Sequence, residues 1–305
     1  MVHPQTVAAI DIGTNSILLL IVRRTSSPVP AIVPLVDQAQ TVRLGQNLLA
    51  TGQLSGPAMD RTLAGLRKYC KTLQTFSPAE VICFGTEALR RASNTAGFRQ
   101  RLSRELDLDL RLLSPAEEAC YTFIGALSSL KELSSDNYLV IDIGGGSTEI
   151  VYGTAEAIEY QESFAIGAVI AKEQFSLKER IDSADLYRLQ NHGKNYWKQL
   201  PIVSQSATVL LTGGTATTLA AIAQQLTDYD IAAIDGYRTS TPAIGRLYSQ
   251  LNQLSVAERA ALPGMEPGRA DIISSALILL LTLLEHFSIN TVQISVRGAR
   301  YGLLL

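Results

Sequence analysis

The sequence predicts an α/β protein built of two related lobes with a cleft between them, and two observations carry this prediction. The phrase "AIDIGTNSILLLIV", which starts at Ala9, returns as "VIDIGGGSTEIVYG" at Val140, with Asp-Ile-Gly and a later serine in register. Along the rest of the chain, β-rich runs alternate with helical patterns, which is typical of α/β folds. Duplication of one domain would place the two similar loops face to face across the cleft.

The composition of the chain is that of a globular protein. Its 305 residues, 47% of them hydrophobic and 18% charged, are enough for one large or two ordinary domains. The net charge of −2 argues against an overall nucleic-acid binder, and three cysteines without metal-like spacing fit a reducing compartment. The first residues lack the basic region of a secretion signal, and the apolar run from Ala276 to Leu284 is too short to cross a membrane. We therefore expect a cytoplasmic protein.

The elements between and after the two phrases follow from local patterns. A helix is expected after Ser55, with Pro57 in its first turn, and the run "EVICFGT" predicts a short strand. The run "DLRLLSPAEEACYTFIGALSSL" predicts a strand, a cap and a helix. After the second phrase, "TVLLTGGTATTLAAIAQQL" predicts a strand, a Gly-Gly turn and a helix, "GRADIISSALILLLTLLEHF" a buried helix, and "TVQISV" a late strand.

The glycine-rich turn of the second phrase fits neither of two familiar nucleotide-binding patterns. A Rossmann fingerprint needs a helix directly after the glycines, and a P-loop needs Gly-Lys-Ser/Thr. Here a β-rich run follows, so the turn is expected to close a hairpin whose free N–H groups and hydroxyls form a nest for an anion, above all phosphate. The candidate phosphate ligands are Gly13, Thr14, Asn15 and Ser16 in the first turn and Gly144, Gly145, Gly146, Ser147 and Thr148 in the second. A hairpin without a ligand is the alternative, and two matched loops make it less favoured than one loop would.

Acidic residues stand next to both turns. Asp11 and Asp142 precede the glycines, and Glu149 follows the second turn. A carboxylate repels phosphate unless a cation lies between them, and Mg²⁺ binds one or two carboxylates together with waters and phosphate oxygens. We therefore expect Mg²⁺ or Mn²⁺ at Asp11, Asp142 and Glu149. The alternatives are turn-capping aspartates and, for Glu149, an exposed strand residue.

A third glycine pair offers another anion site. Gly213 and Gly214 lead into a predicted helix, whose first N–H groups would be free to bind a further phosphate. The alternative is that the two glycines only permit close packing.

The phrase "SPAEEA" separates two neighbouring glutamates by role. Ser114 fits the N-cap of a helix, Pro115 its first position, and Glu117 the position that completes a capping box. Glu118 has no such structural task and lies in the first turn, where it can face the cleft. Glu118 is therefore the candidate general base, although the helix dipole alone would lower its pKa and weaken it. Partial burial or nearby phosphate would act in the opposite direction.

One arginine of the first lobe is a candidate phosphate ligand. Ten basic and five acidic residues lie between Arg61 and Arg111, and most of them are expected on solvated helix faces. Arg90 differs because it comes shortly after a predicted strand end, where a side chain can reach a cleft. Arginine binds phosphate through two parallel hydrogen bonds.

Taken together and in order, several phrases resemble one enzyme family. They are "AIDIGTNSILLLI", "GTEALRRASN", "SPAEEA", "VIDIGGGSTEIV", "LTGGTATTLAAI", "DGYR" and "LPGMEPGRADIISSALILL". The set resembles the exopolyphosphatase/guanosine pentaphosphate phosphohydrolase family of the sugar kinase, heat-shock 70 and actin superfamily. The resemblance implies two ribonuclease-H-like domains, expected at residues 1–122 with 298–305 and at residues 123–297, with the site between them.

The resemblance also implies an activity. It implies hydrolytic removal, with a divalent cation, of the terminal phosphate of inorganic polyphosphate or of the 5′ γ-phosphate of guanosine pentaphosphate. The catalytic glutamate of the family corresponds to Glu118, its metal-site acids to Asp142 and Glu149 with Asp11 in the same cleft, and its phosphate-binding arginine to Arg90. The expected partners are these phosphate compounds, with no nucleic acid and no membrane, and a homodimer is compatible with the sequence. A kinase of the same superfamily and a non-catalytic polyphosphate sensor are the rival interpretations.

The sequence departs from the family pattern at two places, and both are expected to affect how the substrate is bound rather than the chemistry of the reaction. Cys120 stands where the family often has arginine, and the end of the chain reads Gly-Ala-Arg-Tyr-Gly, from Gly298 to Gly302, in place of Gly-Leu-Arg-Glu-Gly.

Overall fold

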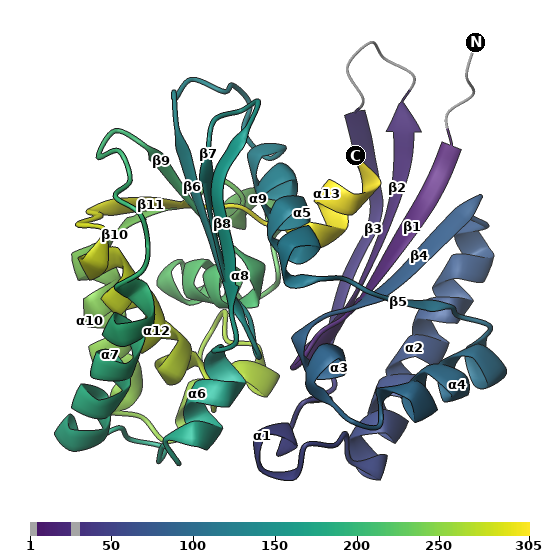
Figure 1. The fold of residues 1–305 in the computed structure, drawn as a ribbon, viewed down its shortest axis with the longest axis horizontal. Coiled ribbons are helices and arrows are strands. Elements are labelled where there is room, and N and C mark those ends of the chain that lie inside the picture. Colours follow the sequence, from purple (N-terminus) through teal and green to yellow (C-terminus); the bar gives the residue numbers. More distant parts are fainter. Residues whose placement is uncertain (1–4, 26–30) are drawn as a thin grey trace.

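A computed structural model describes residues 5–25 and 31–305, which form two lobes side by side (Figure 1). In the first lobe, five strands form a mixed sheet in the order β3-β2-β1-β4-β5. The strands are β1 (Gln5–Ile12), β2 (Ser16–Thr25), β3 (Ala31–Thr41), β4 (Glu80–Gly85) and β5 (Leu110–Leu112). The prediction of an α/β fold is confirmed. Residues 1–4, on which the expectation about a secretion signal partly rests, lie outside the described residues.

The second lobe repeats the topology of the first. Its sheet has the order β10-β11-β9-β6-β7-β8. The strands are β6 (Tyr138–Ile143), β7 (Thr148–Gly153), β8 (Ile158–Phe164), β9 (Thr208–Thr212), β10 (Arg238–Ser240) and β11 (Thr291–Ile294). In both lobes three consecutive antiparallel strands are followed by a parallel strand on the other side of the first, β4 beside β1 and β9 beside β6. The duplication that two short phrases predicted therefore extends to the arrangement of the strands.

Helices cover the sheets. In the first lobe they are α1 (Leu48–Thr51), α2 (Gly56–Phe76), α3 (Glu87–Arg91) and α4 (Thr95–Leu106); α2 begins after Ser55, as predicted, because the Ser55 hydroxyl accepts from the Ala58 N–H. The second lobe contains α6 (Ala168–Gln174), α7 (Ser183–Trp197), α8 (Gly213–Ala223), α9 (Ile231–Ile234), α10 (Thr241–Asn252), α11 (Val256–Ala260), the 3₁₀ turn η1 (Pro267–Arg269) and α12 (Ile273–His286). Helix α12 is buried almost throughout, as its apolar run predicted.

The two remaining helices cross between the lobes. Helix α5 (Pro115–Leu127) follows β5 but packs on the second sheet, where Phe123 lies in one apolar cluster with Val140. Helix α13 (Ala299–Leu304) follows β11 but packs on the first sheet, where Tyr301 clusters with Val7. Each sheet is therefore covered by a helix that follows the last strand of the other lobe. The two helices contact each other at the centre of the molecule (Figure 1). The domain boundaries expected from the sequence stay a prediction.

The contact between α5 and α13 depends on two glycines, and this gives a first prediction. A Cβ at Gly302 would lie 2.0 Å from the Tyr121 carbonyl oxygen, and a Cβ at Gly125 would lie 2.1 Å from the Gly298 carbonyl oxygen. We expect Gly302→Ala to lower the free energy of unfolding by about 1–3 kcal/mol, because backbone atoms must separate to make room. Gly97→Ala is the matched control in α4, since a Cβ there meets open space, and it should raise stability slightly. Equal denaturant midpoints for the two variants would contradict this account of the crossing.

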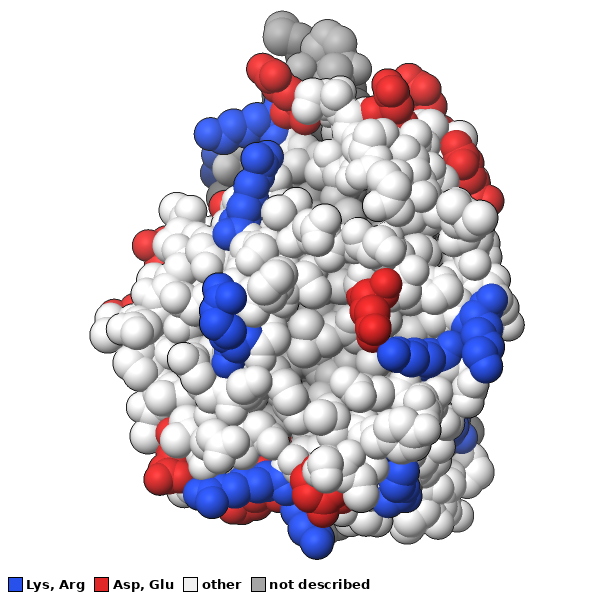
Figure 2. Space-filling model, turned by 90° about the vertical axis from the view of Figure 1, so that its left-hand side faces the viewer, with Lys and Arg blue, Asp and Glu red and all other residues white. Residues whose placement is uncertain are grey.

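Within residues 5–25 and 31–305, no helix combines the length and the apolar character that a membrane span requires. On the face of the second lobe shown in Figure 2, the middle is mostly uncharged, and most lysines, arginines and acidic residues lie towards its edges, with both signs next to each other at the lower edge.

Candidate active site

Each repeated phrase forms a bend. The first bend runs from Gly13 to Ser16 and the second bend from Gly144 to Ser147, and the two lie against each other between the lobes. Both are hairpin turns closed by the same hydrogen bond, from the Gly13 N–H to the Ser16 carbonyl and from the Gly144 N–H to the Ser147 carbonyl, each 3.0 Å long. A Cβ at Gly146 would lie 2.3 Å from Thr14 Oγ1. The bends are therefore in contact with each other, and their hydroxyl-bearing residues are almost fully buried.

Four carboxyl groups gather behind the bends. Burial, together with repulsion from the nearby charges of Glu118 and Asp142, raises the pKa of Asp11 to about 7. Burial likewise raises the pKa of Asp142 to about 6 and that of Glu149 well above its usual value. Asp142 and Glu149 face each other across the second hairpin. The sequence-predicted acids are thus brought together, in a space where full ionisation of all four is costly.

Glu118 reaches this space from the first turn of α5. The predicted capping box is present: the Ser114 N–H donates to Glu117 Oε2 at 2.8 Å, and the Glu117 N–H donates to Ser114 Oγ at 3.2 Å. Glu117 turns outward to pair with Arg111, whereas Glu118 is 8% exposed. Burial raises the pKa of Glu118 to about 7, against the opposing effect of Arg90.

Arg90 lies at the edge of the same space and contacts Glu118 directly. Its Nη1 donates to Glu118 Oε2 at 2.6 Å and to the Leu113 carbonyl at 3.0 Å, and its Nη2 donates to Glu87 Oε2 at 3.0 Å. Several of the other basic residues of this lobe form surface ion pairs instead. These pairs are Arg67–Glu105, Arg99–Asp109 and Arg101–Asp60.

The third glycine pair, Gly213 and Gly214, lies in close contact with two side chains. Gly213 has a φ of +77°, and a Cβ there would lie 2.0 Å from Asp142 Oδ1. A Cβ at Gly214 would lie 2.0 Å from Arg269 Nη2. These glycines therefore permit the close approach of Asp142 and Arg269, while phosphate binding at this turn stays a prediction.

Arg269 is a site residue that the sequence analysis did not single out. It extends from η1 of the second lobe to the first bend, where its Nη2 donates to Ser16 Oγ at 3.2 Å. Its charge also acts to lower the pKa of Asp142, against burial. The phrase "EPGRAD" contains Arg269, but only the folded chain shows that this turn stands opposite the first bend.

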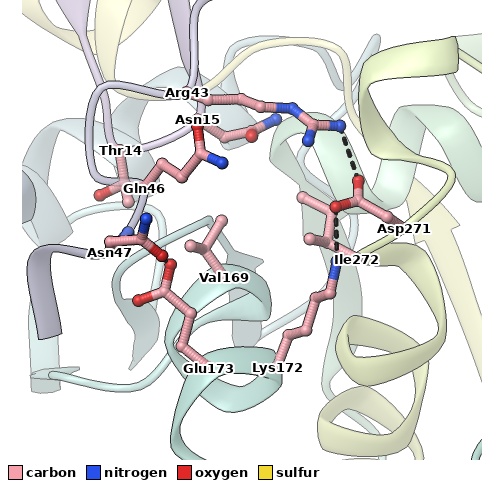
Figure 3. A pocket seen from close by; sticks show the side chains of 10 residues that line it. All are labelled: Thr14, Asn15, Arg43, Gln46, Asn47, Val169, Lys172, Glu173, Asp271 and Ile272. Carbon is pink, nitrogen blue, oxygen red and sulfur yellow. Dashed lines mark hydrogen bonds and ion pairs between the residues drawn. The ribbon is translucent and has the colours of Figure 1, made fainter. Parts of the chain in front are cut away.

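A cavity of about 150 Å³ adjoins the first bend between the lobes (Figure 3). Asp271 of the second lobe accepts from Arg43 of the first lobe at 2.8 Å and from Lys172 at 2.6 Å. The amide side chains of Asn15 and Gln46 line the same cavity. Asp271 thus forms an ion pair with one cation from each lobe, next to residues of the first bend that are candidate phosphate ligands.

The carboxylates of the site suit a divalent cation that takes only one or two of its ligands from the protein. In the described parts of the chain, no three His, Cys, Asp or Glu side chains form a group that could hold a metal ion by themselves. Mg²⁺ needs only one or two carboxylates, because waters and substrate phosphates complete its shell. Asp11 Oδ1 is buried without a hydrogen-bond partner, which is the condition of an oxygen that awaits a ligand.

A sequence model of the Ppx/GppA phosphatase family matches residues 20–305. The chain belongs to this family. The expectation of a hydrolase acting on phosphoric anhydrides is therefore confirmed at the level of the family.

Relatives differ in length and in name. The chain is 33% identical, over 96% of its length and 98% of the relative's, to a protein of Mycobacterium tuberculosis named exopolyphosphatase 2. It is 29% identical to a bifunctional 3-dehydroquinate synthase/phosphatase of Fusobacterium nucleatum, of which it spans only 46%.

Solved structures of the family share the fold. An exopolyphosphatase from Cytophaga hutchinsonii superimposes with a TM-score of 0.89 at 28% identity, over 98% of this chain and 96% of that one. The Ppx/GppA family member of Aquifex aeolicus superimposes with a TM-score of 0.81 at 28% identity, over 99% of this chain and 97% of that one. The predicted actin-like arrangement of two domains is therefore confirmed.

Proposed function

We propose that this Ppx/GppA phosphatase is an exopolyphosphatase, which releases the terminal phosphate of inorganic polyphosphate by attack of a water activated at Glu118. The observation that carries the proposal is the position of Glu118, buried beside Arg90 and close to the two bends whose N–H groups and hydroxyls are the candidate phosphate ligands. The relative named exopolyphosphatase 2, which matches over nearly its whole length, supports polyphosphate as the substrate.

The chain's own residues have distinct roles in this proposal. The N–H groups and hydroxyls of the two bends bind and orient the terminal phosphates, and Arg90 binds one of them. Glu118 accepts the proton of the attacking water, and a pKa of about 7 suits a base that works near neutral pH. A bound Mg²⁺ or Mn²⁺ would stabilise charge on the phosphate oxygens, and Asp142, Glu149 and Asp11 are the residues that would hold it.

The proposal is tested by measuring phosphate release from long polyphosphate, tripolyphosphate and guanosine pentaphosphate side by side. We expect release from polyphosphate with Mg²⁺ or Mn²⁺, and loss of release with a chelator, because the carboxyl cluster repels the substrate without a cation. Faster release from guanosine pentaphosphate would reassign the substrate to the alternative. Tight binding without release would instead indicate a sensor, and phosphate transfer that requires an alcohol acceptor would indicate a kinase.

A further inference from the structure

We propose that Glu87 is a positioning residue, which holds the guanidinium of Arg90 so that a substrate phosphate can take the place of Glu118 on it. This inference rests on the proposed function and names a residue that the mechanism above does not use. Glu87 is the first residue of α3, and its side chain is only 14% exposed.

The contacts of Arg90 show what Glu87 does. The guanidinium is held between carboxylates from two different helices, Glu87 on α3 at 3.0 Å and Glu118 on α5 at 2.6 Å. The Leu113 carbonyl accepts a third bond from it at 3.0 Å. A guanidinium carries five N–H donors in a rigid plane, so these three contacts fix the plane and leave donors for a ligand.

The pairing of Arg90 with Glu118 has a cost for catalysis. A carboxylate that accepts a short bond from an arginine is a weaker base than a free one. Phosphate competes for the same donors, because arginine binds it in the same two-bond geometry as a carboxylate. When a substrate phosphate replaces Glu118 on Nη1, Glu118 is released as a base, and Glu87 keeps the guanidinium in place through Nη2.

The surroundings of Glu87 place it inside the site. A Cβ at Gly146 would lie 3.1 Å from Glu87 Cγ and 2.3 Å from Thr14 Oγ1, so Glu87 lies where α3 meets the second bend and the first. Its second cation, Arg91, is 3.9 Å away, so Arg90 is the closer partner. Both members of the Glu87–Arg90 pair are largely buried, and removing Glu87 leaves Arg90 with Glu118 as its remaining carboxylate partner.

The test is a double-mutant cycle in which equilibrium binding of a non-hydrolysable imido analogue of tripolyphosphate is measured with Mg²⁺ present. We expect Glu87→Ala and Arg90→Ala each to weaken binding by about tenfold or more, and the double variant to bind no more weakly than Arg90→Ala. Glu87→Gln should keep most of the affinity, because its amide oxygen still accepts from Nη2. Additive losses in the double variant would overturn the proposal, since Glu87 would then act independently of Arg90.

Two controls make the cycle decisive. Glu105 of α4 pairs with Arg101 of the same helix and with Arg67 of α2, away from the site, so Glu105→Gln should leave binding unchanged. If Glu87→Ala does not fold, Glu87→Met replaces it in the cycle with Arg90→Ala, because methionine keeps the volume of the side chain but has no oxygen that accepts from Nη2, and the same non-additive losses are expected. Because the analogue is not turned over, a wild-type protein that binds it but releases no phosphate from tripolyphosphate refutes the proposed function alone.

Discussion

Glu118→Gln is expected to lower the turnover of polyphosphate by about 10²–10⁴-fold while the protein stays folded. The amide keeps the size of the side chain and an acceptor for Arg90, but it cannot take a proton from water. Binding of tripolyphosphate should be retained or strengthened, because one negative charge of the buried cluster is removed. The rate of phosphate release and the tripolyphosphate affinity, measured on the same preparation, check both statements.

The neighbouring glutamate supplies the control. Glu117→Gln changes the same chemical group one position earlier, where the side chain closes the capping box and faces outward. It should lower thermal stability slightly and leave turnover near that of the wild type. If Glu118→Gln turned over polyphosphate at a near-normal rate, the assignment of the general base would be refuted.

Asp142→Asn is expected to stabilise the cation-free protein near pH 7.5 and to abolish most of its activity. The folded-state pKa of Asp142 is about 6, raised from its ordinary value of 3.8 by burial. Because the folded state binds this proton more tightly, the corresponding stability is present below about pH 4 and is lost as the pH rises through 6. Asparagine removes this loss, but it also removes a carboxylate that the proposed cation requires.

Chemical denaturation of chelator-treated protein between pH 4 and 8 measures this effect. The free energy of unfolding of the wild type should fall with rising pH over this range, and Asp11, whose folded-state pKa is about 7, contributes in the same direction. The variant should show a shallower fall. Asp109→Asn is the control, because the side chain of Asp109 is 89% exposed. If the Asp142→Asn variant were less stable than the wild type at pH 7.5, the ionised Asp142 side chain would not destabilise the folded protein as expected.

Local patterns predicted the parts of the site that are built locally. The hairpin form of the second glycine turn followed from the β-rich run after it, and the separation of Glu117 from Glu118 followed from a capping box only four residues long. Both signals act between near neighbours in the chain, so their geometry is set before the rest of the fold.

The contributions that sequence reasoning missed come from distant segments. Arg269 reaches Ser16 across 253 positions of the chain, and nothing near Arg269 indicates that its turn faces the first bend. The packing of α5 on the second sheet was missed for the same reason, since a helix pattern shows which face is apolar but not which sheet covers it, whereas the grouping of residues 298–305 with the first domain was expected from the family resemblance alone. The role of Gly213 and Gly214 was left open by the sequence, because a glycine pair before a helix is equally compatible with free N–H groups that bind an anion and with close packing of side chains.

Hydrolysis of tripolyphosphate in water enriched in ¹⁸O tests the account most directly. If a water held by Glu118 attacks the terminal phosphorus at the two facing bends, each released orthophosphate carries one ¹⁸O and the remaining diphosphate carries none. Label in the diphosphate, or release of unlabelled orthophosphate, would contradict the account.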